Sequence, residues 1–358
     1  MAAYTAIDDP GLYFNTILWT GTDTARSITG YGFQPDLAWV KHRSAAYNHV
    51  IFDAVRTAGS DKDLTPVTNA AEGGANAAAY GYVSAFVSDG ISLGEGTTND
   101  SYVNTTDIPY VGWCWKAGTT SGIATSGSES ITPSGYSFNQ TAGFSIIAYT
   151  GSTRTSDILP HGLGAAPGMI IVKSIDGARE WVVFNKGMNP TAPEDYYMAL
   201  NDTYAALNNT ASFNDTAADT VNFTIGTDAQ INAADDFIAY LWAPKQGYSK
   251  FGSYEGNGNA DGTFVYTGFR PAWIMTKSVD STSAWHMFDN KREGYNVDND
   301  ALVADADSVE ATTDMLDILS NGFKFRIATD PNVAETYIYA AFAEAPFVNS
   351  NGVPCNAR

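Results

Sequence analysis

The sequence is short of basic residues. It holds 19 Lys and Arg against 39 Asp and Glu among 358 residues, which gives a formal net charge of −20. Because proteins bind nucleic acid mainly through Lys and Arg side chains that neutralise phosphates, this composition argues against a nucleic-acid partner. It argues equally against an anionic membrane surface, which attracts the same side chains. The acidic residues are spread along the chain, so we expect them to form a solubilising surface charge.

Long apolar runs and cysteine are also scarce. No segment approaches the roughly 20 apolar residues needed to cross a bilayer. The first residues lack the basic and apolar regions of a secretory signal, so we expect synthesis in a reducing cytosol and no membrane contact. Cys114 lies in an apolar stretch and Cys355 lies close to the last residue. Both are predicted to be free thiols rather than a disulfide.

Motifs that carry chemistry are missing as well. None of the four histidines (His42, His49, His161 and His286) has metal-ligand spacing with another. There is no nucleophile elbow and no phosphate-binding loop. The acidic runs at residues 296–300 and 305–307 lack the twelve-residue calcium loop. They are best interpreted as solvated loop acids, with a bound calcium ion left open. We therefore predict no catalytic, cofactor-binding or metal-binding residue, and no cofactor.

What organises the chain is a pattern that occurs three times. In each copy a proline is followed six residues later by a lysine, and a small polar residue comes twelve residues after the lysine. An aromatic residue, one further residue and a glycine precede each copy, and an aromatic-rich apolar run follows it. Self-similarity of this kind predicts repeated structural units. The repeat-defining residues are Pro35, Lys41 and Asp53 in the first copy, Pro167, Lys173 and Asn185 in the second, and Pro271, Lys277 and Asp289 in the third, with Trp181 and Trp285.

Each copy predicts an antiparallel hairpin. In the third copy Trp273 should face Asp289, and Lys277 should face Trp285, all on one face of the sheet. The opposite face is equally apolar, which is typical of strands covered on both sides. We interpret each repeated lysine as structural, lying along the facing ring and reaching the small polar residue, with a ligand site as the alternative. The tryptophans predicted to be buried are Trp39, Trp181, Trp273 and Trp285.

Short strands and frequent turn signals indicate an all-β fold of three tandem homologous β-sandwich units. Short helices are expected only near residues 199–207 and 314–319, and residues 56–80 are expected to form a weakly structured surface excursion. The predicted parts are an N-terminal arm (1–12), three units (13–118, 143–246 and 247–358) and a Gly/Ser/Thr-rich linker (119–142). The arm and the linker are candidates for segments that order only on docking.

Aromatic residues are plentiful. The chain has 8 Trp and 20 Tyr, more than three small cores require. Tyr and Trp on loops stack on sugar rings or anchor protein partners. We therefore predict loop-borne Tyr and Trp that are available for weak glycan contact.

Four stretches carry a resemblance to a known family: residues 26–44, 140–151, 247–278 and 337–347. With the sequence between them they resemble a repeat in virion proteins of tailed bacteriophages, especially marine ones, and the resemblance covers nearly the whole chain from Leu12 to Phe347. It implies lectin-like (concanavalin A-like, SPRY-like or jelly-roll-like) sandwiches. It also implies a role in tail fibres, in receptor binding or in capsid decoration, without bringing any catalytic or binding residue.

The resulting expectation is a non-enzymatic structural and adhesive virion component made in the host bacterial cytoplasm. Its expected partners are other virion proteins and a host-surface glycan, with self-association left open. The alternative is a carbohydrate-binding or carbohydrate-active protein on the same scaffold. Absence of a long shaft segment favours a compact accessory protein of the head or tail over a fibre.

Overall fold

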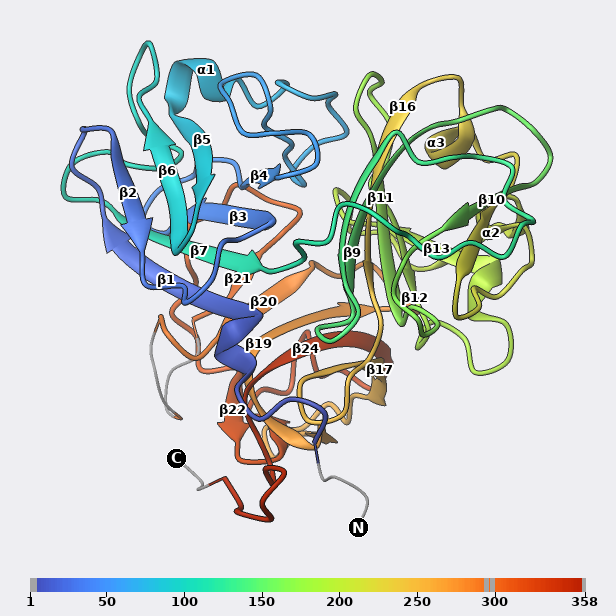
Figure 1. Ribbon diagram of the computed structural model, residues 1–358. Helices are drawn as coiled ribbons and strands as arrows, with labels where there is room; N and C mark the ends of the chain where they lie inside the picture. Colours follow the sequence, from blue (N-terminus) through green and yellow to red (C-terminus); the bar gives the residue numbers. More distant parts are fainter. Residues whose placement is uncertain (1–4, 293–295, 297–299, 356–358) are drawn as a thin grey trace.

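The computed structural model describes residues 5–292, 296 and 300–355. The chain folds into antiparallel sheets, which confirms the all-β prediction. Figure 1 shows the first unit in blue and cyan, the second in green and yellow, and the third in orange and red, arranged around a common centre. None of the helices in the described ranges is long and apolar enough to span a membrane. Within the described residues neither Cys114 nor Cys355 forms a disulfide, as predicted.

A larger and a smaller sheet make up each unit. The first unit has β1 (Phe14–Thr20), β7 (Pro109–Trp115), β3 (Leu37–His42) and β4 (Val50–Asp53) opposite β2 (Arg26–Thr29), β6 (Gly90–Gly94) and β5 (Tyr82–Val87). The second has β14 (Leu207–Asn208), β13 (Tyr196–Ala199), β12 (Val182–Asn185), β11 (Met169–Ser174), β16 (Asp236–Trp242), β9 (Phe144–Thr150) and β8 (Gly135–Asn139) opposite β10 (Asp157–Pro160) and β15 (Asn222–Ile225). The third has β17 (Ser249–Glu255), β24 (Thr336–Pro346), β19 (Phe269–Ser278), β20 (His286–Asp289) and β21 (Leu302–Val303) opposite β18 (Phe264–Tyr266), β23 (Gly322–Phe325) and β22 (Leu316–Leu319).

The predicted helices are wrong. Residues 200–206 connect β13 to β14, and strand β22 occupies Leu316–Leu319. In β22 the side chains of Leu316 and Ile318 are buried and alternate with less buried ones. This alternation is typical of a strand and not of a helix. The helices of the described chain are single turns, namely α1 (Ala77–Tyr80), α2 (Thr210–Phe213) and α3 (Ala229–Asn232), with the 3-10 turns Pro10–Leu12 and Pro193–Asp195.

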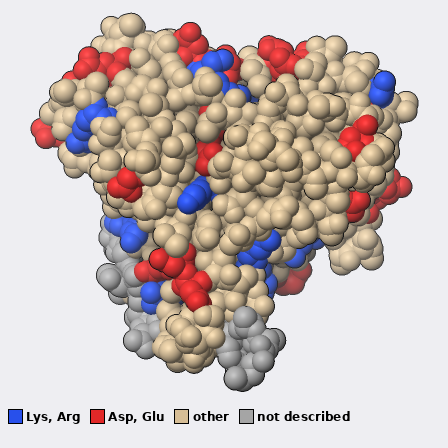
Figure 2. Space-filling view, in the orientation of Figure 1, with Lys and Arg blue, Asp and Glu red and all other residues tan. Residues whose placement is uncertain are grey.

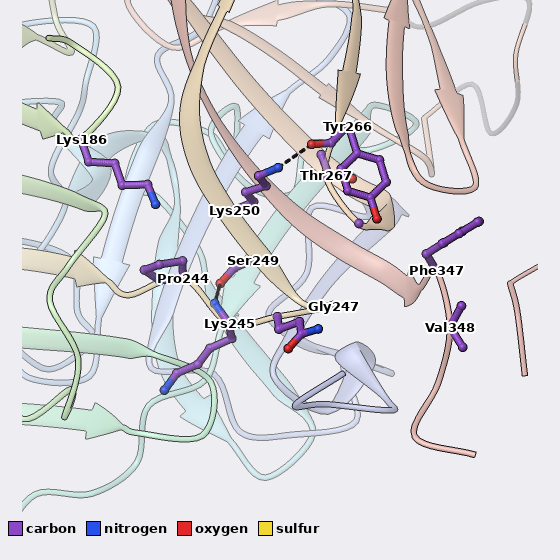
Figure 3. A pocket seen from close by; sticks show the side chains of 12 residues that line it. Lys186, Pro244, Lys245, Gly247, Ser249, Lys250, Tyr266, Thr267, Phe347 and Val348 are labelled. Carbon is purple, nitrogen blue, oxygen red and sulfur yellow. Dashed lines mark hydrogen bonds between the residues drawn. The ribbon is translucent and has the colours of Figure 1, made fainter. Parts of the chain in front are cut away.

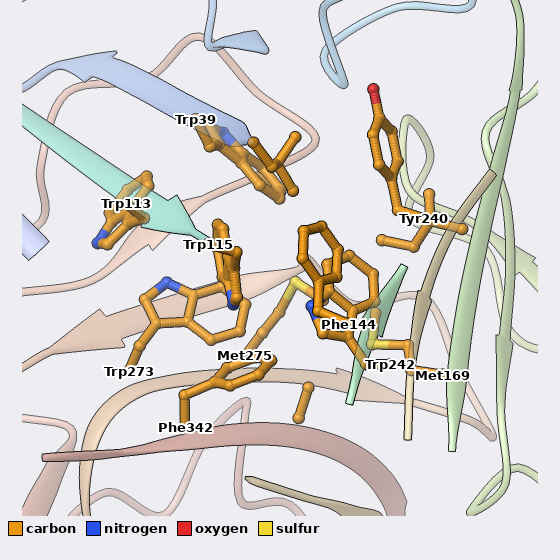
Figure 4. Close-up of a cluster of buried hydrophobic side chains, with 14 of the residues drawn as sticks. Trp39, Trp113, Trp115, Phe144, Met169, Tyr240, Trp242, Trp273, Met275 and Phe342 are labelled. Atoms are coloured by element: carbon orange, nitrogen blue, oxygen red, sulfur yellow. The ribbon is translucent and has the colours of Figure 1, made fainter. Parts of the chain in front are cut away.

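Four hydrophobic clusters hold the sheets together. Three lie inside the individual units, between the larger and the smaller sheet. The fourth, which we call the shared core, takes side chains from all three units. At its centre the ring of Trp115 lies 6.1 Å from that of Trp242 and 5.6 Å from that of Trp273 (Figure 4). Each larger sheet is therefore covered on both faces, by its own core and by the shared core.

The two faces of the repeated hairpins divide between these cores as predicted. In β3, Trp39 belongs to the shared core, whereas Val40 belongs to the core of the first unit. The same division holds for Met275 and Ile274 in β19. A slip of one residue in either strand would exchange the two faces.

Two segments predicted to be loosely held are built into the fold. Ile7 of the N-terminal arm is 5% exposed and packs in the shared core, and the Ala6 amide donates to the carbonyl of Gln246. Within the predicted linker, strand β8 adds to the edge of the sheet of the second unit by pairing with β9. Residues 5–12 and 135–139 are therefore ordered by contacts within the chain, while residues 1–4 of the arm lie outside the described residues.

The ends of the described chain meet. The Ser350 amide donates to Asp8 Oδ1 at 2.7 Å. A circular permutant that joins the ends through a Gly-Ser linker and opens between Ser121 and Gly122 should therefore fold, because both opened residues are exposed. Its free energy of unfolding is expected to stay within about 2 kcal/mol of the wild-type value, since loop closure changes entropy slowly with length. Urea unfolding measures it, and a permutant that remains unfolded would contradict this closed arrangement.

Candidate functional site

The repeated hairpins adopt the predicted register. The small polar residue at the end of each hairpin lies opposite the first residue of the pairing: Leu37 opposite Asp53, Met169 opposite Asn185, and Trp273 opposite Asp289. The three prolines are buried. Pro35 and Pro167 lie two residues before β3 and β11, and Pro271 lies at a register shift inside β19. Proline has no amide hydrogen, so these are positions where a strand tolerates it.

The three repeated lysines connect the units. Each is fully buried, and each ammonium group donates to the carbonyl of the next residue and to a carbonyl of another unit. The contacts are Lys41 Nζ to His42 O (2.7 Å) and Asp307 O (3.1 Å), Lys173 Nζ to Ser174 O (2.9 Å) and Asn69 O (3.2 Å), and Lys277 Nζ to Ser278 O (3.2 Å) and Thr203 O (3.0 Å). The first unit thus contacts the third, the third contacts the second, and the second contacts the first.

In the second and third units, the tryptophan that faces the lysine contacts the same neighbouring unit as the lysine does. Trp181 Nε1 donates to Thr65 O at 2.9 Å, and Trp285 Nε1 donates to Ala199 O at 2.8 Å. Thr65 lies four residues before Asn69, and Ala199 lies four residues before Thr203, so each neighbouring unit offers two carbonyls at the same spacing. In the first unit His49 takes the place of the tryptophan and accepts a hydrogen bond from Trp39 Nε1 at 2.9 Å.

These contacts correct two expectations. The lysines bind backbone carbonyls instead of reaching the small polar residue, and within the described chain none of the three lies over an aromatic ring. Residues 56–80 are not a free surface excursion, because residues 65–69 receive both Trp181 and Lys173. Buried donors need acceptors, and a neighbouring backbone supplies them here.

Buried carboxylates also cross between units. Asp53 Oδ2 binds Arg56 Nε at 2.6 Å and accepts from Tyr240 Oη of the second unit at 2.8 Å. Asp289 Oδ2 binds Arg292 Nε at 2.7 Å and accepts from Trp113 Nε1 of the first unit at 2.9 Å. Burial would raise the pKa of Asp289, but the Arg292 guanidinium and further hydrogen bonds hold it below its usual value.

In the second unit an uncharged residue, Asn185, occupies the position of Asp53 and Asp289. Asn185 Nδ2 donates to Tyr339 O of the third unit at 3.2 Å. Three residues further on, where the other units have arginine, stands Met188. The ion pair and the uncharged pair therefore occupy corresponding places, and every one of the three positions connects two units.

A second recurring contact escaped the sequence analysis. The aromatic residue before each copy donates to a carbonyl, and a buried asparagine follows that carbonyl in the chain. The bonds are Trp19 Nε1 to Val103 O (2.8 Å), Tyr149 Oη to Ile231 O (2.7 Å) and Tyr254 Oη to Pro331 O (2.8 Å), followed by Asn104, Asn232 and Asn332. An asparagine five or six residues before each closing apolar run was the available signal.

The glycines of the same contact have no room for a side chain. A Cβ atom on Gly21 would lie 1.9 Å from Thr105 O, and one on Gly151 would lie 2.0 Å from Ala233 O. On Gly256 it would lie 1.9 Å from the carbonyl of the residue after Asn332. The aromatic-x-Gly pattern is therefore a docking contact for the asparagine-containing loop.

The histidines have structural roles. All four are buried, and burial lowers the pKa of each. His42 Nδ1 accepts from the amides of Ser44 and Ala45, and His161 Nδ1 accepts from the amide of Leu163. Their ring nitrogens hold loops in place.

The acidic runs do not form a site in the described residues. Residues 297–299 of the first run lie outside that part of the chain, and in the second run Asp305 Oδ1 accepts from the Trp285 amide at 2.9 Å. Across residues 5–292, 296 and 300–355 no group of three or more His, Cys, Asp and Glu side chains is placed to hold a metal ion.

Aromatic residues are distributed differently from the prediction. All eight tryptophans are buried, including Trp39, Trp181, Trp273 and Trp285, as expected for those four. No tryptophan is therefore available to a glycan. Tyr266 and Phe264 are the large aromatic side chains found exposed in the described ranges, at 52% and 44%.

The lysine pKa values give a testable consequence. Burial lowers the pKa of Lys277 to about 8, from an ordinary value of 10.5. Between these pH values the unfolded chain binds a proton that the folded chain has lost, so this lysine makes stability rise with pH. Lys277→Met should lower the free energy of unfolding by about 1–3 kcal/mol near neutral pH, because two carbonyls lose their donor. The loss should be larger at higher pH.

Urea unfolding at about pH 7.5 and about pH 9.5 measures this difference. Lys291→Met, at an exposed position, is the control and should change little at either pH. A loss for Lys277→Met that shrinks between the two pH values would contradict the assignment.

Comparison with known proteins places the chain in one family. Residues 9–346 match the family described as "Domain of unknown function (DUF7483)", and the chain belongs to that family. No curated protein and no solved structure matches the chain.

Proposed function

We propose that this chain is a non-enzymatic structural and adhesive component of a tailed-bacteriophage particle. Its three units are homologous, lectin-like β-sandwiches closed into one body, which docks on other virion proteins of the head or tail. It presents loops for weak contact with host-surface glycan or protein. Copies can also associate with one another on the particle.

The observation that carries the proposal is the use made of the repeat-defining residues. The lysines, the small polar residues and the facing tryptophans are buried, and they donate or accept hydrogen bonds between units. These residues are repeated at positions where they join one unit to the next around the shared core. That use supports a structural role for the repeat. Together with the resemblance of the sequence to phage virion repeats, this favours an assembly component over an enzyme.

The surface supports the same role. On the face shown in Figure 2 neutral side chains predominate, with scattered acidic groups and fewer basic ones. A net charge of −20 keeps a protein soluble at high copy number and repels nucleic acid. Such a surface suits a protein on the outside of a particle that encloses a genome.

The alternative remains a carbohydrate-binding or carbohydrate-active protein on this scaffold. The pocket near Tyr266, described below, favours binding as part of that alternative. Glycan binding is compatible with the proposed non-enzymatic role, whereas polysaccharide turnover would contradict it.

The test is the protein content of purified phage particles that carry the gene. Mass spectrometry should detect the chain in the particles, and immunogold labelling should place it at the head or the tail. The purified chain should leave host polysaccharide undegraded. Absence from the particles, or depolymerisation of a polysaccharide, would overturn the proposal.

A further inference from the structure

An open pocket of about 430 Å³ lies between the second and third units. The turn at 244–250 forms one wall, the loop at 266–268 forms another, and Phe347 and Val348 close the opposite side (Figure 3). Its volume is within the range of sites that bind small molecules.

Three lysines line this pocket and no acidic residue does. Lys186 is exposed, Lys245 and Lys250 are half-buried, and none of them forms an ion pair with a described carboxylate. In a chain with twice as many acidic as basic residues, three unpaired cations in one pocket are an unusual concentration of positive charge. Burial and the charge of Lys186 lower the pKa of Lys250.

One wall of the pocket suits a sugar ring. Tyr266 is 52% exposed, and the Lys250 ammonium lies 5.3 Å from its ring centroid. The same ammonium donates to Tyr266 O at 2.6 Å, which fixes the lysine over one face of the ring and leaves two of its protons free. Aromatic faces pack against the apolar faces of sugars, while ammonium groups bind carboxylates and phosphates.

We propose that this pocket binds an acidic saccharide, with its carboxylate or phosphate on Lys186 and Lys250 and its ring on Tyr266. Lys245 adds positive charge at the rim. This inference rests on the proposed contact with host-surface glycan and names the chemical class of that glycan.

Calorimetric titration of the full chain tests it with four probes: methyl glucuronide, methyl glucoside, glucose 6-phosphate and inorganic phosphate. The glucuronide or glucose 6-phosphate should bind at least about tenfold more tightly than the neutral glucoside, because a charged hydrogen bond is added. Whichever acidic sugar binds more tightly distinguishes a carboxylated from a phosphorylated glycan. Inorganic phosphate should bind more weakly than either, since it has no ring to pack on Tyr266.

Three variants locate the binding. Lys186→Gln should weaken the acidic sugar about tenfold, and its fold is safe because the side chain is exposed and makes no described hydrogen bond. Tyr266→Ala should weaken both acidic sugars and leave inorganic phosphate unchanged. Lys291→Gln removes the same charge outside the pocket and should change nothing.

Equal binding of charged and neutral sugars, no binding of any probe, or full binding by Lys186→Gln would overturn the pocket assignment. Inorganic phosphate binding as tightly as the sugars would do the same, because it would mark a plain anion site. The particle experiment is separate, since docking by a chain that binds no sugar leaves the virion role standing. Sugar binding by a chain absent from particles would leave the pocket and remove the virion role.

Discussion

Asp289→Asn should lower the free energy of unfolding by about 3 kcal/mol, because it leaves Arg292 buried without its main partner. The Arg292 side chain is 1% exposed, and its Nε lies 2.7 Å from Asp289 Oδ2. This loss of unfolding free energy is at the lower end of the range for a broken buried ion pair, because a second carboxylate still neutralises Arg292. Glu310 Oε1 lies 3.5 Å from Arg292 Nη1. Asparagine keeps the shape but only one acceptor oxygen. Asp289 Oδ1 accepts from two backbone amides, and Oδ2 accepts from Arg292 Nε and Trp113 Nε1, so the loss combines the missing charge with two lost hydrogen bonds.

The second unit supplies a matched double variant. Asp289→Asn combined with Arg292→Met recreates the Asn185 and Met188 pair found there. It should recover roughly 1–3 kcal/mol relative to the sum of the two single variants, which is the coupling expected for direct partners. Asn185→Asp is the reverse control and should destabilise, because it buries a carboxylate with no arginine three residues away.

Urea unfolding followed by tryptophan fluorescence measures all four proteins. Losses that simply add, with no recovery in the double variant, would show that Asp289 and Arg292 do not act as a pair.

Trp115→Ala is expected to have the largest single effect, a loss of about 3–5 kcal/mol. The Trp115 ring is 2% exposed and packs against rings from the other two units, at 6.1 Å from Trp242 and 5.6 Å from Trp273. Its indole nitrogen has no hydrogen-bond partner among the described residues, so the loss measures packing alone. Differential scanning calorimetry should show a lower melting temperature with a single transition.

Leu207→Ala is the control for this variant. Leu207 is 42% exposed, and its truncation should shift the melting temperature only slightly. A Trp115→Ala protein that melts at the wild-type temperature would show that the shared core contributes little.

The hairpin register could be predicted because side chains alternate strictly and both faces are apolar, which fixes how Trp273 and Asp289 meet. The excess of aromatic residues was also correctly noticed. Its meaning was missed, because the surplus tryptophans fill a fourth core that exists only when three units meet. A pattern within one unit carries no information about which neighbouring surface will cover it.

The partners of the repeated lysines could not be predicted for a similar reason. Lys173 and Lys277 bind the backbone carbonyls of Asn69 and Thr203. Every residue has a backbone carbonyl, so the amino-acid sequence does not indicate which one accepts a hydrogen bond. The pocket at Tyr266 gathers Lys186 from one stretch and Lys250 from another, so charge counting along the chain does not reveal it. Contacts between distant backbone segments are set by tertiary packing.

Native-state hydrogen exchange, read separately for β7, β16 and β24, tests most directly the claim that three units close into one body. Each is an interior strand of the larger sheet of one unit and places side chains in the shared core. We predict that their slowest amides exchange with the same opening free energy, and that Trp115→Ala lowers it equally in all three. A loss of protection confined to β7, with β16 and β24 unchanged, would contradict the account.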